Sequence, residues 1–172
     1  MPGVQQGFVD ITGMKFNKRT YNSPGDFISD VLFPFKNRRK LRSVMRGTLI
    51  SPAFRERLML AVTAVNGCRY CSYFHTGEAL KSGLSEQEIS RLLSGESATC
   101  PPEEAPAVIY AQHWAESNAR PDPLALQKLQ EIYGIEKADA IQIILRMIRI
   151  GNLSGNSWDY LLYRLSFGRW GQ

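Results

Sequence analysis

Beyond about residue 23, apolar stretches alternate with short polar breaks that begin or end helices. Strand-like alternation of apolar and polar positions is scarce. Residues 141–150 alternate in part, but the length of the stretch and its alanine-containing lead-in favour a helix. The pattern predicts an all-α fold, with helices within residues 23–35, 37–47, 51–67, 68–83, 85–95, 102–119, 122–134, 136–155 and 156–168.

Capping signals support several of these helices. Ser51 precedes Pro52 at the start of one helix, and Asn66-Gly67 ends it. Ser85 with Glu88 forms a capping-box pattern. Residues 1–23 contain Gly and Asn without clear periodicity, so we predict an N-terminal arm over 1–23 and a single helical domain over 24–172.

Composition and charge narrow the class of protein. The 172 residues are 44% hydrophobic, which suits one globular domain. Residues 1–50 contain nine Lys/Arg and three Asp/Glu, although the whole chain carries only +5. The basic segment Lys36–Arg46 has no nucleic-acid motif and no interleaved aromatics. A solvated helix face or a surface for an acidic partner is therefore favoured over nucleic-acid binding.

No signal peptide is expected, because the N-terminus lacks a basic start followed by an apolar run. No membrane-spanning helix is expected, because the sequence contains no stretch of ~18 apolar residues. We therefore expect a cytoplasmic protein. In that compartment thiols are kept reduced, so a closely spaced cysteine pair indicates redox catalysis or metal binding rather than a static disulfide.

Such a pair follows the Asn66-Gly67 break. Cys68, Cys71 and His75 are spaced i, i+3 and i+7, so a helix beginning near Cys68 places them on one stripe. The first turn of that helix would lower the pKa of a thiol and so favour a thiolate. A thiolate serves equally as a nucleophile or as a metal ligand.

The preceding helix adds a carboxylate. If both helices form an antiparallel hairpin, Glu56, ten residues before Asn66, lies level with His75, nine residues after it. Carboxylate, imidazole and thiol then form a candidate relay that activates a nucleophile. Alternatively, Glu56 only stabilises the dipole of its helix, His75 is a packed histidine, and the two cysteines are small apolar residues. This interpretation is the weaker one, because four residues would then have compatible spacing by coincidence.

Glu56, an eleven-residue gap, and then Cys68-x-x-Cys71-x-x-x-His75 resemble the signature of the alkylhydroperoxidase D (AhpD)-like branch of the carboxymuconolactone decarboxylase family. The resemblance covers residues 51–94 and extends loosely to the C-terminal helices. It implies an AhpD-like helical bundle.

The resemblance also implies an activity: reduction of a small hydroperoxide, with a separate thiol or dithiol protein as reductant and no bound cofactor. Cys71 would be the peroxidatic thiol, Cys68 the resolving thiol, and His75 with Glu56 the proton relay. The best-known peroxidases of the family carry a second His between the cysteines. This chain has Tyr70 there, so a shorter relay is expected. A homo-oligomer, a trimer or a multiple of one, is expected as well.

Two alternatives remain open. Cys68, Cys71 and His75 could supply three zinc ligands, with Cys100 or His113 as the fourth. The protein could instead be a redox sensor or interaction protein that docks through Lys36–Arg46. Otherwise Cys100 is interpreted as an incidental loop thiol and His113 as a packed or surface histidine. The segment 151–162, rich in Gly and Asn, is interpreted as a cap between the last two helices rather than as part of a site.

Overall fold

The computed structural model describes residues 16–46 and 49–171, and within them it is all-helical, as predicted. Residues 1–15 of the predicted arm lie outside the described residues. The eight helices are α1 (Pro24–Lys36), α2 (Arg38–Met45), α3 (Pro52–Asn66), α4 (Arg69–Lys81), α5 (Glu86–Leu93), α6 (Ala105–Glu116), α7 (Pro123–Tyr133) and α8 (Ile135–Leu165).

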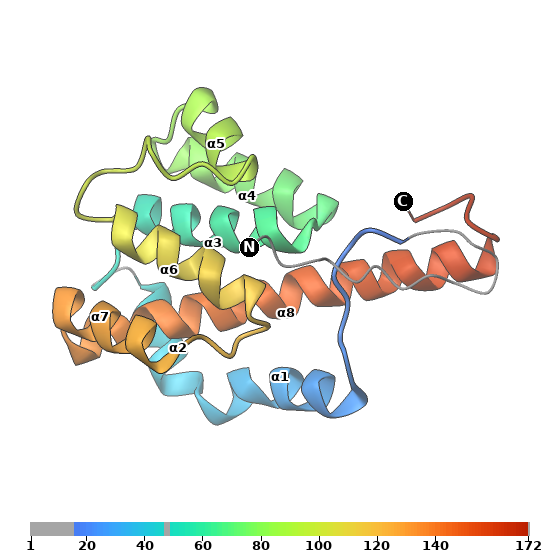
Figure 1. Cartoon of the computed structure of the whole chain (residues 1–172), viewed down its shortest axis with the longest axis horizontal. Helices are drawn as coiled ribbons and strands as arrows, with labels where there is room; N and C mark the ends of the chain where they lie inside the picture. The colour runs from blue at the N-terminus through green and yellow to red at the C-terminus, as the bar shows by residue number, and fades with distance from the viewer. Residues whose placement is uncertain (1–15, 47–48, 172) are drawn as a thin grey trace.

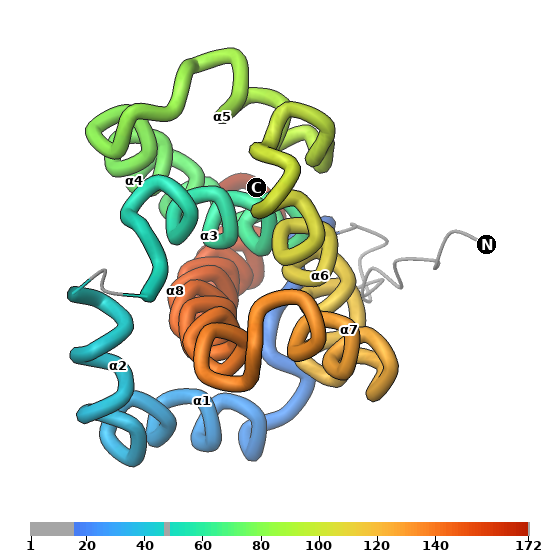
Figure 2. Tube along the Cα trace, turned by 90° about the vertical axis from the view of Figure 1, so that its left-hand side faces the viewer, coloured from blue at the N-terminus to red at the C-terminus, as the bar shows by residue number. Residues whose placement is uncertain are grey.

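The long helix α8 is the centre of the fold. It contacts α1, α2, α3, α4, α6 and α7, and Figure 2 shows these helices around it. Helix α3 lies along α8, with α4 and α5 stacked on its other side (Figure 1). The core forms where α3, α6 and α8 meet, around fully buried Leu58, Val108 and Ile144.

The predicted caps account for the helix boundaries around the site. The Ser51 hydroxyl accepts the Phe54 N–H, and Gly67 ends α3 in the left-handed region at φ 71°. Asp122 caps α7 in the same way. Glu103 and Glu104 lie directly before α6 rather than in its first turn. Glu104 accepts a hydrogen bond from the Arg57 guanidinium at 2.9 Å, which ties that position to α3.

The prediction of two helices over 136–155 and 156–168 is wrong. Helix α8 continues through Gly151 and Gly155 to Leu165. Neither glycine has a positive φ, so neither ends the helix. Both glycines instead face sulfur atoms, as described below.

Residues 16–23 contain no helix and pack against the bundle. Phe16 is buried and its ring meets Tyr160 and Tyr163 at centroid distances of 5.2 and 5.5 Å. The Arg19 guanidinium donates to the Ala115 carbonyl at 2.6 Å. This segment therefore connects α8 to the end of α6. No helix among the described residues is long and apolar enough to cross a membrane.

Candidate functional site

The two cysteines lie where the chain turns from α3 into α4. Cys68 is the N-cap of α4, and its Sγ accepts the backbone N–H of Cys71 at 3.4 Å. Cys68 is fully buried and Cys71 partly buried. Both thiols are free, and their sulfur atoms are 3.0 Å apart. A disulfide of about 2.0 Å would need the sulfurs to approach by only ~1 Å.

The hydrogen bond between the two thiols divides their acidities. This hydrogen bond and, to a smaller extent, the backbone N–H groups of Cys71 and Tyr70 lower the pKa of Cys68 to about 6, against the opposing effect of burial. The same hydrogen bond, together with burial, raises the pKa of Cys71. The hydrogen bond therefore favours a pair that shares one proton over a pair of two neutral thiols.

Helix α8 comes close to the sulfurs because it presents glycines to them. A Cβ at Gly151 would lie 3.6 Å from Cys71 Sγ, which is ordinary contact. A Cβ at Gly155, one turn on, would lie only 3.0 Å from Cys68 Sγ and 3.2 Å from the Tyr70 ring. Sequence reasoning interpreted these glycines as a helix break, whereas the close packing of α8 on the dithiol explains them.

Buried asparagines lie beside these glycines. Asn152 accepts a hydrogen bond from Asn66 and donates one to Thr63, both at 3.1 Å. It also hydrogen-bonds Cys71, an effect that opposes the rise in the thiol's pKa. Asn156 donates to the Asn66 carbonyl at 2.7 Å. Asn152 and Asn156 are four residues apart, and so are the neighbouring glycines. This spacing places both pairs on one helix surface, a signal in the sequence that the prediction of a helix break did not use.

Glu56 and His75 meet across the α3–α4 hairpin, as the residue count predicted. His75 Nδ1 lies 2.7 Å from Glu56 Oε2. The other carboxylate oxygen accepts from Arg55 Nε at 3.2 Å, and Glu56 is 2% exposed. A carboxylate bound at Nδ1 fixes the orientation of the imidazole and leaves Nε2 as the nitrogen for proton transfer.

Tyr70 does not extend this pair. Its hydroxyl donates to Asp159 Oδ1 at 2.8 Å, and the Arg69 guanidinium donates to the same oxygen at 2.8 Å. Lys18 Nζ donates to the other oxygen of Asp159 at 2.6 Å. Burial raises the pKa of Asp159, but the hydrogen bonds from Lys18 and Tyr70 outweigh that effect and leave the pKa below its usual value. Tyr70 therefore anchors α4 to α8 and to the segment before α1.

The candidate fourth zinc ligands lie apart from the dithiol. Cys100 follows α5, beside Arg57 and Glu88, and burial raises its pKa to about 11. His113 Nε2 accepts the Asp122 N–H at 3.3 Å, near the start of α7. In the part of the chain that the structure describes, no three His, Cys, Asp or Glu residues gather as a metal site. The zinc alternative therefore has no supporting geometry there.

The basic segment Lys36–Arg46 covers the end of α1 and all of α2. Most of its side chains are exposed, and Lys40 reaches Asp139 on α8 at 3.5 Å. It lies on the first two helices, whereas the dithiol lies at the junction of the third and fourth.

Comparison with known proteins agrees with this arrangement. The family model described as "Carboxymuconolactone decarboxylase family" matches residues 38–116, a segment that contains both cysteines of the dithiol, Glu56 and His75. The Bacillus subtilis (strain 168) protein named "Uncharacterized protein YdfG" is 31% identical over 113 residues, covering 64% of this chain and 71% of that protein. No solved structure gives a significant match. On these matches the chain belongs to the carboxymuconolactone decarboxylase family.

Proposed function

We propose that this protein is a thiol-dependent peroxidase that reduces hydroperoxides through the Cys68–Cys71 dithiol, in the manner of the AhpD-like branch of its family. One observation carries the proposal: two free thiols lie 3.0 Å apart at a helix N-terminus. The Glu56–His75 pair, one helical turn beyond Cys71, supplies a proton acceptor. The reaction requires no bound cofactor.

The first step takes place at Cys71, because Cys68 is fully buried and Cys71 is the more accessible thiol. His75, oriented by Glu56, accepts the Cys71 proton through a bridging water. The Cys71 thiolate then attacks the terminal oxygen of the hydroperoxide, and the O–O bond breaks. Cys71 becomes a sulfenic acid, and the leaving alkoxide takes the proton from His75 and departs as an alcohol.

The second step uses the low pKa of Cys68. Its thiolate, stabilised by the N-terminal N–H groups of α4, attacks the sulfenic sulfur of Cys71. The S–S bond forms, the S–O bond of the sulfenic acid breaks, and the leaving hydroxide takes a proton from solvent to form water; this proton balances the one that Cys68 released to solvent on becoming a thiolate. One hydroperoxide and two thiols thereby yield an alcohol, a water and a disulfide. An external dithiol protein then restores both thiols by exchange.

We propose a homo-oligomer in the cytoplasm, a trimer or a multiple of one, as the working form. Members of the family are often oligomeric. Several aromatic side chains near the dithiol stay exposed in the single chain: Tyr70 at 44%, Tyr73 at 86%, Phe74 at 60% and Trp158 at 56%. A second subunit over this face would remove them from water.

Counting thiols tests the proposal. One equivalent of an organic hydroperoxide should remove two free thiols per chain, release one equivalent of alcohol, and leave Cys100 reduced. Dithiothreitol should restore both thiols, and a Cys100→Ser variant should behave like the unsubstituted protein. Persistence of all three thiols, or stoichiometric tightly bound zinc, would refute the peroxidase. Oxidation without turnover by any disulfide reductase would favour the redox-sensor alternative.

A further inference from the structure

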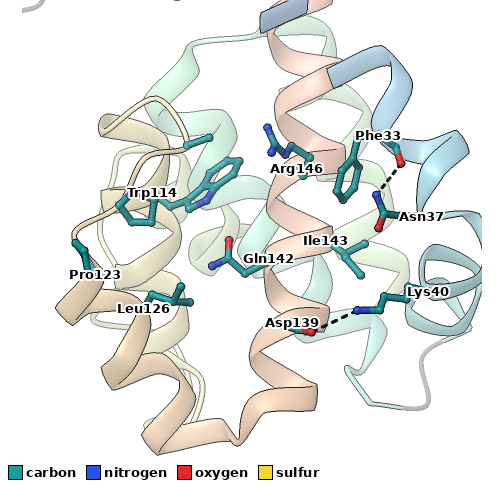
Figure 3. A pocket seen from close by; sticks show the side chains of 12 residues that line it. Phe33, Asn37, Lys40, Trp114, Pro123, Leu126, Asp139, Gln142, Ile143 and Arg146 are labelled. Carbon is teal, nitrogen blue, oxygen red and sulfur yellow. Dashed lines mark hydrogen bonds and ion pairs between the residues drawn. The ribbon is translucent and has the colours of Figure 1, made fainter. Parts of the chain in front are cut away.

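A pocket of about 470 Å³ is lined by residues of α1, α2, α6, α7 and α8 and of the loop after α6 (Figure 3). Neither cysteine of the dithiol lines it. We call it the lateral pocket. Phe33, Trp114, Leu126 and Ile143 supply apolar surface to it. Gln142 marks its position on α8, nine residues before Gly151, and so ~13 Å along the helix from the contact with Cys71.

A second, more polar cavity of about 240 Å³ adjoins the first, and we call it the arginine cavity. The two share Ala119 and Arg146. Arg120 and Arg149 also line the arginine cavity. A single ligand could therefore occupy both spaces, with Arg146 at the boundary.

Positive charge exceeds negative charge around this boundary. Arg146 and Arg149 both donate to buried Asp30, so two guanidinium groups share one carboxylate. A second acid of the arginine cavity, Asp26, lies 3.8 Å from Arg120. The charged groups of the two spaces together are the cations Lys40, Arg120, Arg146 and Arg149 and the carboxylates Asp26, Asp30 and Asp139.

Arg146 is placed to receive an anion. Its guanidinium lies over the Phe33 ring at 5.3 Å, which fixes its plane, and it uses Nη1 for Asp30 at 2.9 Å. Its side chain remains 33% exposed. A guanidinium has five N–H donors in a planar fork, and this geometry matches a carboxylate.

We propose that the lateral pocket binds a small organic carboxylate with an apolar, ring-sized body. The body would pack between Phe33, Trp114 and Ile143, and the carboxylate would accept hydrogen bonds from Arg146 at the mouth of the arginine cavity. The volume is within the range of small-molecule pockets, which combine apolar walls with a few placed polar groups. The site is separate from the dithiol and stands independently of the peroxidase proposal.

The test is isothermal titration of the full chain with 3-phenylpropionate, compared with 3-phenylpropanamide, which has the same body without the charge. We expect saturable binding of the carboxylate at one site per chain, at least about tenfold tighter than binding of the amide. Absence of saturable binding, or equal affinity for both compounds, would overturn the proposal.

Three variants locate the site. Arg146→Gln should weaken binding of the carboxylate by about tenfold or more and leave binding of the amide nearly unchanged. Leu126→Trp, which fills the pocket, should weaken both. Arg39→Gln removes the same charge from an exposed position outside both spaces and should have no effect. If Arg39→Gln and Arg146→Gln weaken binding equally, the effect is general charge and the site is wrong. If Arg146→Gln fails to fold, Leu126→Trp and the amide still decide.

Discussion

His75 Nδ1 lies 2.7 Å from Glu56 Oε2, across a hairpin that separates the two residues by 19 positions. The proposed relay requires them to act as one unit on Cys71. Glu56→Gln and His75→Gln should each slow peroxide-dependent oxidation of Cys71 by about 10²–10⁴, the usual contribution of a general base. The measurement is the rate of thiol loss near neutral pH.

The double variant distinguishes a unit from two separate effects. Groups acting together are strongly non-additive, so Glu56→Gln with His75→Gln should be little slower than the slower single variant. Circular dichroism must show unchanged helicity for all three proteins. Fully additive losses would mean that the two residues act separately, and unchanged kinetics in Glu56→Gln would leave Glu56 with a structural role only.

Peroxide should oxidise the Cys68→Ser and Cys71→Ser variants differently. In Cys68→Ser, peroxide should leave a sulfenic acid on Cys71 that a dimedone-type reagent traps, because the resolving thiolate is absent. In Cys71→Ser, oxidation of the buried Cys68 should be much slower. Mass mapping locates the adduct. Trapping mainly on Cys68 in the unsubstituted protein would reverse the assignment.

The pKa of Cys68 predicts a pH dependence. Its folded value of about 6 lies below the ~8.5 of an unfolded cysteine. Folding therefore favours the thiolate, and this contribution to stability is present above the unfolded pKa and lost as pH falls through about 6. The ultraviolet absorbance of one thiolate should titrate near pH 6 in the folded chain. Cys68→Ser should abolish that transition; its survival there would assign the thiolate to another cysteine.

Substitution by alanine should affect the two glycines of α8 differently. Inside a helix, alanine is more favourable than glycine by about 0.5–1 kcal/mol. Gly151→Ala places its methyl at ordinary contact with Cys71, so the free energy of unfolding should rise by about that amount. Gly155→Ala must displace Cys68 Sγ and the Tyr70 ring, so it should show no gain and should slow disulfide formation. Chemical denaturation of both variants measures the difference; equal stabilisation would contradict the close approach.

Asp30 should matter more for stability than for chemistry. It is 1% exposed and receives both Arg146 and Arg149, so Asp30→Asn should lower the free energy of unfolding by about 3–5 kcal/mol. Asp139→Asn is the matched control, since its carboxylate is half-exposed at 3.5 Å from Lys40 and should contribute less than about 1 kcal/mol. If urea denaturation shows that both variants lower the free energy of unfolding by similar amounts, burial of the Asp30 ion pairs does not account for their contribution to stability.

The hairpin that holds the candidate site was predictable because its signals are local. Ser51 and Gly67 fix where α3 begins and ends, and helix geometry then determines which residues face each other. The juxtaposition of Glu56 and His75 followed from counting residues away from the turn. Their chemical roles, like those of the two thiols, stay predictions.

The contribution of α8 was not predictable from local rules. Glycine is unfavourable in a helix, so Gly151 and Gly155 indicated a break. The reason for both glycines is tertiary packing, since each gives room to a sulfur atom that lies at least 80 residues earlier in the chain. The same applies to Asp159, which meets Lys18 and Tyr70 through long-range contacts that no periodicity encodes.

The continuity of α8 has a thermodynamic consequence. One unbroken helix carries Gly151 and Gly155 against the sulfurs and Gln142, Ile143 and Arg146 against the lateral pocket. The oxidation state of the dithiol and the occupancy of the lateral pocket therefore both act on the same helix. Whatever factor a bound carboxylate imposes on the dithiol–disulfide equilibrium, the disulfide must impose the same factor on the affinity for that carboxylate. Titrating 3-phenylpropionate into the reduced and the oxidised protein measures this reciprocal coupling, and equal affinities would show that the two ends of the helix are energetically independent.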